Sequence, residues 1–162
     1  MQFKTFVNAV ALALFAASVH AKVPAGTYSI VNKVPSSDGL SRAITFNGEG
    51  QTVTVSFDDS TASKQWIVED YDGKAQSISP VDGDGLQCAW GQDVVTVLPA
   101  HNYVWTITQN EDDPTTYTIQ DGGETVYWGL GATDVNTEVT ISGEKTETGE
   151  QSWKFVEAQL SV

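Results

Sequence analysis

Three tryptophans occupy equivalent places in three short stretches of the chain, and this repeat constrains the fold more than any other feature. The stretches are Gln65-Trp66-Ile67-Val68, Val104-Trp105-Thr106-Ile107 and Ser152-Trp153-Lys154-Phe155. In each one, the tryptophan and the residue two positions later would face the same side of a strand. The tryptophans lie 39 and 48 residues apart, so we expect three copies of a unit of about forty residues that share one core.

Each copy is predicted to hold four short strands and no helix. Gly, Asp, Asn and Pro separate segments of alternating polar and apolar residues throughout the chain after residue 21. The third strands match across the copies at 53–55, 95–97 and 139–141, and the first strands match at 28–30, 77–79 and 117–119. A propeller needs about four blades or more, so three units favour an all-β chain with the β-trefoil fold. About twelve strands are expected, at 28–31, 41–46, 52–57, 65–69, 75–81, 86–90, 94–98, 103–109, 116–120, 125–128, 138–142 and 152–157.

The N-terminus has the pattern of a secretory signal peptide. Lys4 precedes an apolar run from residue 6 to residue 17, and Val19-His20-Ala21 supplies small residues where a signal peptidase cleaves. This run is too short to span a membrane comfortably, which disfavours the alternative of a membrane anchor. We therefore predict a signal peptide at 1–21, a single domain at 22–162 and a secreted protein without membrane insertion.

Charge and cysteine content exclude several classes of partner and bond. The chain carries 21 Asp and Glu against 8 Lys and Arg, and this acidity disfavours nucleic acid and anionic membrane surfaces. The one cysteine, Cys88, excludes an internal disulfide and is expected to be a small buried apolar residue. The sequence leaves the oligomeric state open.

The second copy differs most from the others. A Trp-Gly pair ends the second strand of the second and third copies, as Trp90-Gly91 and Trp128-Gly129, whereas the first copy has Phe46-Asn47-Gly48. Tyr103 has no aromatic counterpart in the other copies, and we expect it to share one face of a strand with Trp105. We therefore predict a functional role for Tyr103. Trp90 has two open interpretations, a core residue or an exposed ring, and the repeat explains Trp105 as a core residue.

Several stretches of the chain resemble basidiomycete ricin-B-like β-trefoil lectins that bind the α1,3-fucosylated chitobiose core of N-glycans. The resemblance runs from about residue 25 to residue 156 and is most specific between Asn102 and Thr106. The matching runs are Gly26-Thr27-Tyr28, Asn32-Lys33-Val34, Thr52-Val53-Thr54-Val55-Ser56, Ser77-Ile78-Ser79-Pro80-Val81, Val97-Leu98-Pro99, Asn102-Tyr103-Val104-Trp105-Thr106 and Ile119-Gln120-Asp121-Gly122.

The resemblance implies a lectin whose partners are glycans and glycoproteins, with a role in fungal defence, although the signal-like N-terminus departs from the family, whose members are made without one. The glycan would carry N-acetylglucosamine and fucose and would lie on the second unit. Trp90, Tyr103 and Trp105 would supply the essential rings, and Trp105 would then serve both the core and the ligand. By position, the implied carbohydrate contacts are Trp90, Gly91, Leu98, Asn102, Tyr103, Val104, Trp105 and Thr125.

A protease inhibitor is the main alternative function. Small secreted trefoils often block proteases through one exposed loop. Arg42, Lys64 or Lys74 could then enter the specificity pocket of a trypsin-like protease, although ordinary surface charge explains each of them as well.

An enzyme is disfavoured. The predicted mature chain holds one histidine, His101, and the neighbouring carboxylates in Asp58-Asp59 and Asp112-Asp113 would point to opposite faces of a strand. Asp82-Gly83-Asp84-Gly85 is expected to be a turn because it lacks the remaining ligands of a calcium loop. We therefore expect no catalytic residues, no metal and no other cofactor.

Overall fold

The computed structural model of the protein describes residues 21–59, 61–146 and 148–158. Apart from Ala21, the predicted signal peptide lies outside the described residues. These residues form twelve strands, as predicted, and one short 3-10 helix. In chain order they are β1 (Gly26–Asn32), β2 (Arg42–Thr45), β3 (Thr54–Phe57), η1 (Ala62–Lys64), β4 (Trp66–Asp70), β5 (Ala75–Pro80), β6 (Leu86–Trp90), β7 (Val95–Pro99), β8 (Trp105–Gln109), β9 (Tyr117–Asp121), β10 (Tyr127–Leu130), β11 (Val139–Ser142) and β12 (Trp153–Glu157). The described part of the chain has no helix long and apolar enough to cross a membrane.

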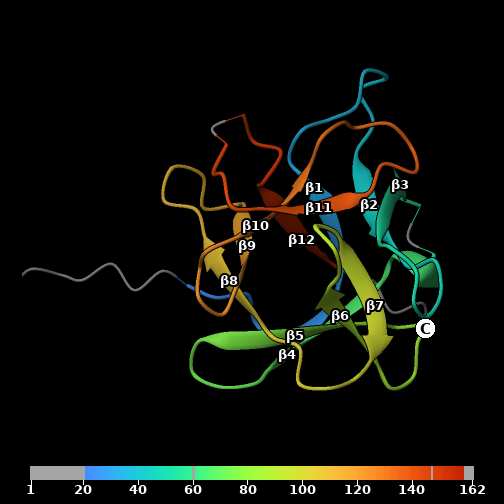
Figure 1. The fold of residues 1–162 in the computed structure, drawn as a ribbon. Helices are drawn as coiled ribbons and strands as arrows, with labels where there is room; N and C mark the ends of the chain where they lie inside the picture. Colours follow the sequence, from blue (N-terminus) through green and yellow to red (C-terminus); the bar gives the residue numbers. More distant parts are fainter. Residues whose placement is uncertain (1–20, 60, 147, 159–162) are drawn as a thin grey trace, which may run out of the picture.

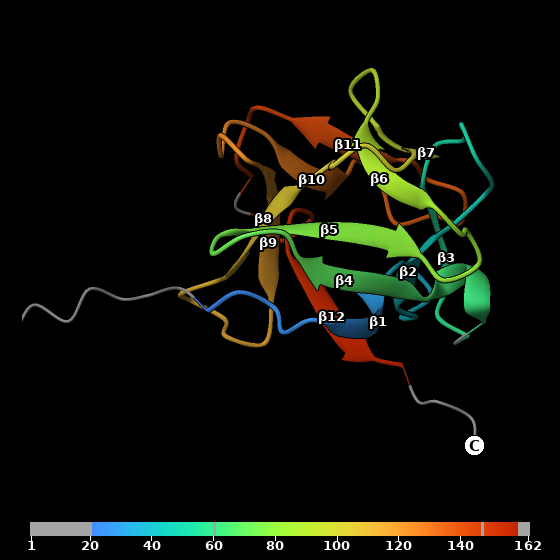
Figure 2. The same cartoon turned by 90° about the horizontal axis from the view of Figure 1, so that it is seen from below.

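Six strands close into an antiparallel barrel. Strand β1 pairs with β4, β4 with β5, β5 with β8, β8 with β9, β9 with β12, and β12 with β1 again. Figure 2 shows β4 and β5 side by side along this barrel. Closure leaves no free barrel edge that could pair with another chain.

The other six strands form three hairpins, β2–β3, β6–β7 and β10–β11 (Figure 1). Isolated bridges join each hairpin to both others, through Thr52 and Thr96, Thr54 and Glu138, and Val94 and Thr140. A barrel of six strands with three joined hairpins is the predicted β-trefoil. Its units are β1–β4, β5–β8 and β9–β12.

The three repeated tryptophans connect the barrel to the hairpins. Trp66, Trp105 and Trp153 open the last strand of their units and are buried. Each indole N–H donates a hydrogen bond of 3.1 Å to a main-chain carbonyl of the second strand in the same unit. A buried indole N–H without a partner is costly, so this bond holds each hairpin in one register on the barrel.

The acceptors of these bonds identify the equivalent residues of the hairpins. They are the carbonyls of Ile44, Cys88 and Trp128, and all three residues are fully buried. The counterpart of Trp128 is therefore Cys88, and the sequence match of Trp128 with Trp90 is wrong by two residues. Trp90 lies two positions after Cys88. Its counterparts are therefore Leu130, two positions after Trp128, and Phe46, two positions after Ile44.

The first strands also needed a correction, because the match in the second unit is wrong by one residue. Ile30, Ile78 and Ile119 face Phe155, Val68 and Ile107 across their ladders and fill the same core position. By that register, buried Gln76 replaces the tyrosines Tyr28 and Tyr117 of the other units.

A residue that precedes the repeats completes the core. Val23 is 1% exposed and belongs to the core cluster. The Gln76 amide donates a hydrogen bond of 2.7 Å to the Val23 carbonyl, and the Lys22 ammonium lies 2.9 Å from the Asp70 carboxylate. The second unit therefore holds this short segment in place.

We expect Trp66→Ala to lower the free energy of unfolding by about 3–5 kcal/mol, because it removes a fully buried indole and leaves the Ile44 carbonyl without its donor. Urea denaturation followed by circular dichroism measures this loss. Val156→Ala, at an exposed position of β12, is the control and should change stability by less than about 0.5 kcal/mol. A loss below about 1 kcal/mol for Trp66→Ala would contradict the assigned role of the indole.

Candidate functional site

Trp90 is an exposed ring at a position that the other units cover. Its side chain is 49% exposed, whereas Leu130 is 4% exposed and Phe46 packs against the core. The sequence left open whether Trp90 is a core residue or an exposed ring. The structure shows that it is a surface residue. It ends β6, where the chain turns tightly and the Gly91 N–H donates a hydrogen bond of 2.8 Å to the Val94 carbonyl.

Gly91 is required by this turn. A Cβ atom at position 91 would overlap the Thr96 hydroxyl and would lie 2.9 Å from the Val94 carbonyl oxygen. Any larger residue would push the turn apart and would move the neighbouring Trp90 ring. The structure thus gives Gly91 a positioning role in the candidate site.

Tyr103 is half-buried but does not lie on a strand. The expected strand from residue 103 is wrong, since β8 begins at Trp105 and the chain before it turns through Asn102, whose φ is 56°. The Tyr103 N–H donates a hydrogen bond of 3.2 Å to the side-chain oxygen of Gln87. Gln87 faces Leu98 across the β6–β7 ladder, so this bond brings the turn of Tyr103 to Leu98.

The counterparts of Trp90 in the other two units bond to the residue three positions before the closing tryptophan, and Asn102 holds that position in the second unit. In the first unit, the N–H of Phe46 donates to the Ser63 carbonyl at 2.8 Å, and in the third unit the N–H of Leu130 donates to the Glu150 carbonyl at 3.3 Å. Phe46 and Leu130 are the counterparts of Trp90. Ser63 and Glu150 precede the closing tryptophans by three residues, as Asn102 does. The same relation makes Lys64 and Gln151, both buried, the counterparts of Tyr103.

Trp105 belongs to the core and not to the exposed surface. Its side chain is 2% exposed, and its ring packs edge-on against Trp128 with the ring centroids 4.9 Å apart. The resemblance implied that the Trp105 ring stacks on the sugar. Its burial contradicts this role, because the face of a sugar cannot reach the ring. Trp128 is fully buried too, so its ring offers no second stacking surface.

Thr125 lies on a turn whose hydrogen bonds converge on the carboxylate of Asp121. Asp121, which faces Trp105 across the β8–β9 ladder, accepts hydrogen bonds from the N–H groups of Gly123, Thr125 and Val126 and from the Thr125 hydroxyl. Burial raises the pKa of Asp121, but the hydrogen bonds from Val126, Thr125 and Gly123 outweigh it and leave the pKa lowered. The charged carboxylate therefore holds Thr125 next to the start of β8.

The remaining predicted residues border the same surface. Val104 is half-buried between Tyr103 and Trp105. His101 and Asn102 are exposed, and the His101 ring lies 6.3 Å from the Tyr103 ring between centroids, tilted by 56°. The structure thus joins the predicted residues through two connections, from Tyr103 to Leu98 through Gln87 and from Thr125 to Trp105 through Asp121. Gln87 escaped the sequence analysis, because an amide on an alternating strand carries no signal of its own.

The described residues contain neither a reactive thiol nor a cluster of metal ligands. Burial raises the pKa of the Cys88 thiol well above its usual value, so the thiol is not poised as a nucleophile. Among the residues that the structure describes, no group of three or more His, Cys, Asp and Glu side chains could hold a metal ion. Residues 82–85 form the predicted turn between β5 and β6.

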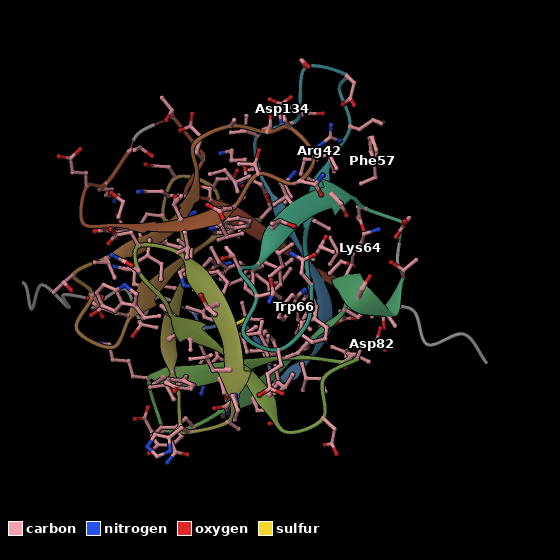
Figure 3. The ribbon with its side chains drawn as sticks, turned by 45° about the vertical axis from the view of Figure 1, so that its right-hand side comes forward. Arg42, Phe57, Lys64, Trp66, Asp82 and Asp134 are labelled. Carbon is pink, nitrogen blue, oxygen red and sulfur yellow. The ribbon has the colours of Figure 1, made fainter. Side chains whose placement is uncertain are left out.

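Two of the three residues proposed for protease inhibition are unsuitable. Arg42 is 4% exposed, pairs with Asp38 at 2.9 Å and lies under the ring of Phe57, which Figure 3 shows beside it. Lys64 is buried and pairs with Asp59 at 2.5 Å. Neither side chain could enter a protease pocket without breaking these contacts. Lys74 remains available, because it is exposed on the turn between β4 and β5.

The comparisons with known proteins agree with this picture. A family model described as CCL2 lectin-like matches residues 26–153, which is more than half of the chain. No curated protein is similar enough in sequence to match.

Solved structures of the same fold carry several functions. The ricin B-like lectin of Macrolepiota procera, solved with lactose, is 20% identical with a TM-score of 0.68 and covers 85% of this chain and 99% of its own. A proteinase inhibitor from Coprinopsis cinerea is 16% identical with a TM-score of 0.66 and covers 83% and 99%. A mosquitocidal holotoxin is 18% identical with a TM-score of 0.74 over 85% of this chain, which spans 18% of that toxin. At these identities the likeness shows the fold alone.

We expect Trp90→Ala to destabilise the protein by about 1 kcal/mol and Trp105→Ala by about 3–5 kcal/mol, because only the second ring is buried. Urea denaturation of the two variants measures the difference. Equal losses would mean that the Trp90 ring packs as a core residue and would remove the exposed surface on which the candidate site depends.

Proposed function

Because the chain belongs to the CCL2-like lectin family, we propose that it binds glycans through the surface of its second unit around Trp90 and Tyr103. The observation that supports this proposal most is the exposure of Trp90, at a position where the other units bury Leu130 and Phe46 against the core. Covering this half-exposed indole with the face of a sugar would remove apolar surface from water, which is favourable.

The proposed mechanism of binding combines apolar stacking with a few hydrogen bonds. The C–H face of a pyranose ring packs on the Trp90 indole, and Tyr103 supplies a second ring at the edge of the sugar. The acetamido methyl of N-acetylglucosamine and the methyl of fucose add apolar surface, worth about 25 cal/mol per Å² buried. The side chain of Asn102 and the main chain near Val104 fix the orientation, at about 0.5–1.5 kcal/mol for each bond.

The residues behind this surface position it. Trp105 holds the second unit together through its bond to Cys88, and Gly91 holds the turn after Trp90. Thr125 extends the surface from the third unit through the Asp121 turn. We propose the fucosylated chitobiose core of N-glycans as the ligand, since its two N-acetylglucosamine residues and its fucose each carry a methyl group that can pack on the rings of Trp90 and Tyr103. A shallow site of this size should bind with a Kd of about 1 μM, near −8 kcal/mol.

The wider setting is also part of the proposal. The signal-like N-terminus supports secretion, and a secreted lectin that recognises fucosylated N-glycans would act in fungal defence against grazing animals. No bond is made or broken in this function, so we propose a binding protein and not an enzyme. Calcium is not required, and binding should persist in a chelator.

Protease inhibition is the alternative that one observation favours. The Lys74 side chain is 61% exposed and pairs with Glu124, which is exposed as well, so a protease could displace that partner. Tight inhibition of trypsin that Lys74→Ala removes and Tyr103→Ala leaves unchanged would support this alternative over the lectin.

We expect Tyr103→Ala and Trp90→Ala each to reduce binding of a core-fucosylated chitobiose glycopeptide below detection, because each removes one of the two rings of the proposed site. Isothermal titration calorimetry measures the loss. Tyr71→Ala is the matched control, since Tyr71 is an exposed tyrosine on the turn after β4 and should bind normally. Full binding by Tyr103→Ala would show that the site lies elsewhere.

We expect Gln87→Met to weaken glycan binding about tenfold, because it removes the acceptor of the Tyr103 N–H and leaves the turn less ordered. Gln87→Glu keeps an acceptor oxygen and should retain most of the affinity. A melting temperature measured for both variants separates loss of positioning from loss of fold. Equal affinities for Gln87→Met and the unchanged protein would contradict the positioning role.

A further inference from the structure

A polar cleft lies outside the proposed site, on the outer face of the β8–β9 hairpin. Its volume is about 910 Å³, within the range of small-molecule sites. Thr108, Thr118 and Gln120 form its floor, and Tyr127, Gln151 and Lys33 stand around it. None of these residues belongs to the surface around Trp90.

The floor of the cleft is held in place by hydrogen bonds among its own residues. The Asn110 amide donates to the Thr116 hydroxyl at 2.9 Å and accepts from the Thr118 hydroxyl at 2.5 Å. On the opposite wall, the Gln151 amide donates to the Glu144 carbonyl at 2.6 Å and its oxygen accepts from the Thr146 N–H at 2.8 Å. A ligand would meet side chains that are already ordered, which lowers the entropic cost of binding.

The composition of the floor breaks the threefold symmetry. The outer positions of β8–β9 are Thr106 opposite Gln120 and Thr108 opposite Thr118; Thr106 is buried, and the other three line the cleft. The corresponding pairs are Ile67 with Ser79 and Glu69 with Ser77 in β4–β5, and Lys154 with Val31 and Val156 with Ser29 in β12–β1. Only the β8–β9 face consists entirely of hydroxyl and amide side chains. The barrel does not require this, because these residues face away from its core.

The charges around the cleft favour an uncharged ligand. Lys33 pairs with Asp113 at 2.8 Å, and the other charged residues of the lining are Glu111, Asp112 and Lys145, so acidic and basic side chains nearly balance there. The chain as a whole has a net charge of −13, which repels anions. Tyr127, half-buried at the side of the cleft, makes no hydrogen bond through its hydroxyl within the described residues. Its ring and free hydroxyl match the C–H face and the hydroxyl groups of a sugar.

We propose that this cleft is a second saccharide site that takes a neutral mono- or disaccharide. The Tyr127 ring packs on the sugar, and the Thr108 hydroxyl and the Gln120 amide exchange hydrogen bonds with its hydroxyl groups. The Thr118 oxygen, whose hydrogen is donated to Asn110, accepts a hydrogen bond from the sugar. The choice of a saccharide as ligand rests on the proposed lectin function, whereas the location rests on the cleft and its symmetry breaking. Two sites on different faces would allow one molecule to cross-link glycans.

The test removes the first site and asks whether binding remains. The Tyr103→Ala variant, labelled with ¹⁵N, is titrated with lactose, diacetylchitobiose and methyl α-mannoside, and amide shifts are followed by NMR. We expect at least one of these sugars to move the amide signals of Thr108, Thr118, Gln120 and Tyr127. Adding Thr108→Val or Tyr127→Ala should weaken that binding at least fivefold. Thr108→Val preserves shape, and the Thr108 hydroxyl makes no hydrogen bond with the described residues, so this variant remains informative if Tyr127→Ala does not fold.

The control variant and the outcomes separate this inference from the proposed function. Ser79→Ala, at the position equivalent to Gln120 on the β4–β5 face, should leave sugar binding unchanged. If Tyr103→Ala binds none of the three sugars while the unchanged protein binds the glycopeptide, the second site is wrong and the first stands. If the cleft signals of Tyr103→Ala respond to a sugar but the glycopeptide moves no amide signal of Trp90 or Asn102 in the unchanged protein, the first site is wrong and the second stands. No response of the cleft signals to any sugar overturns the second site.

Discussion

The bond between a buried indole N–H and a main-chain carbonyl determines how this protein is assembled. It occurs three times with the same length, from Trp66, Trp105 and Trp153 to the second strands of their units. Because the acceptor is a carbonyl, the residue that supplies it can be an isoleucine, a cysteine or a tryptophan without loss of the bond. The repeat therefore survives large changes in side chain, and only the geometry of the main chain must be kept.

Positions that this bond does not restrict are where the units diverge, and both proposed binding surfaces lie there. Trp90 is exposed where Leu130 is buried, and Tyr103 stands where the other units bury Lys64 and Gln151. The outward-facing residues of β8–β9, where the polar cleft lies, likewise differ in type from those of the equivalent ladders β4–β5 and β12–β1. The residues that the three units share are explained by the common core. The residues that differ are therefore informative about function.

Much of the fold followed from the sequence, since strand positions depend on local alternation and on turn residues. The spacing of the tryptophans was sufficient to predict three units and the β-trefoil. Register was not predictable in the same way. Trp128 was matched with Trp90 because both precede a glycine, yet Trp128 occupies the place of Cys88, which no similarity of side chains reveals. The position of Tyr103 before β8 depends on Gln87, a contact between residues 16 apart along the chain, and a strand pattern contains no trace of it.

One consequence of the structure concerns the origin of such a fold by duplication. Val23 precedes all three units, yet it is almost entirely buried and is held by Gln76, where the other units have tyrosines. Three identical copies of any one unit would therefore lack Val23, and copies of the first or third unit would also lack the Gln76 amide that binds its carbonyl. An ancestral homotrimer, or a perfectly symmetric redesign of this chain, would need a larger side chain at position 76 in order to keep water out of the interior.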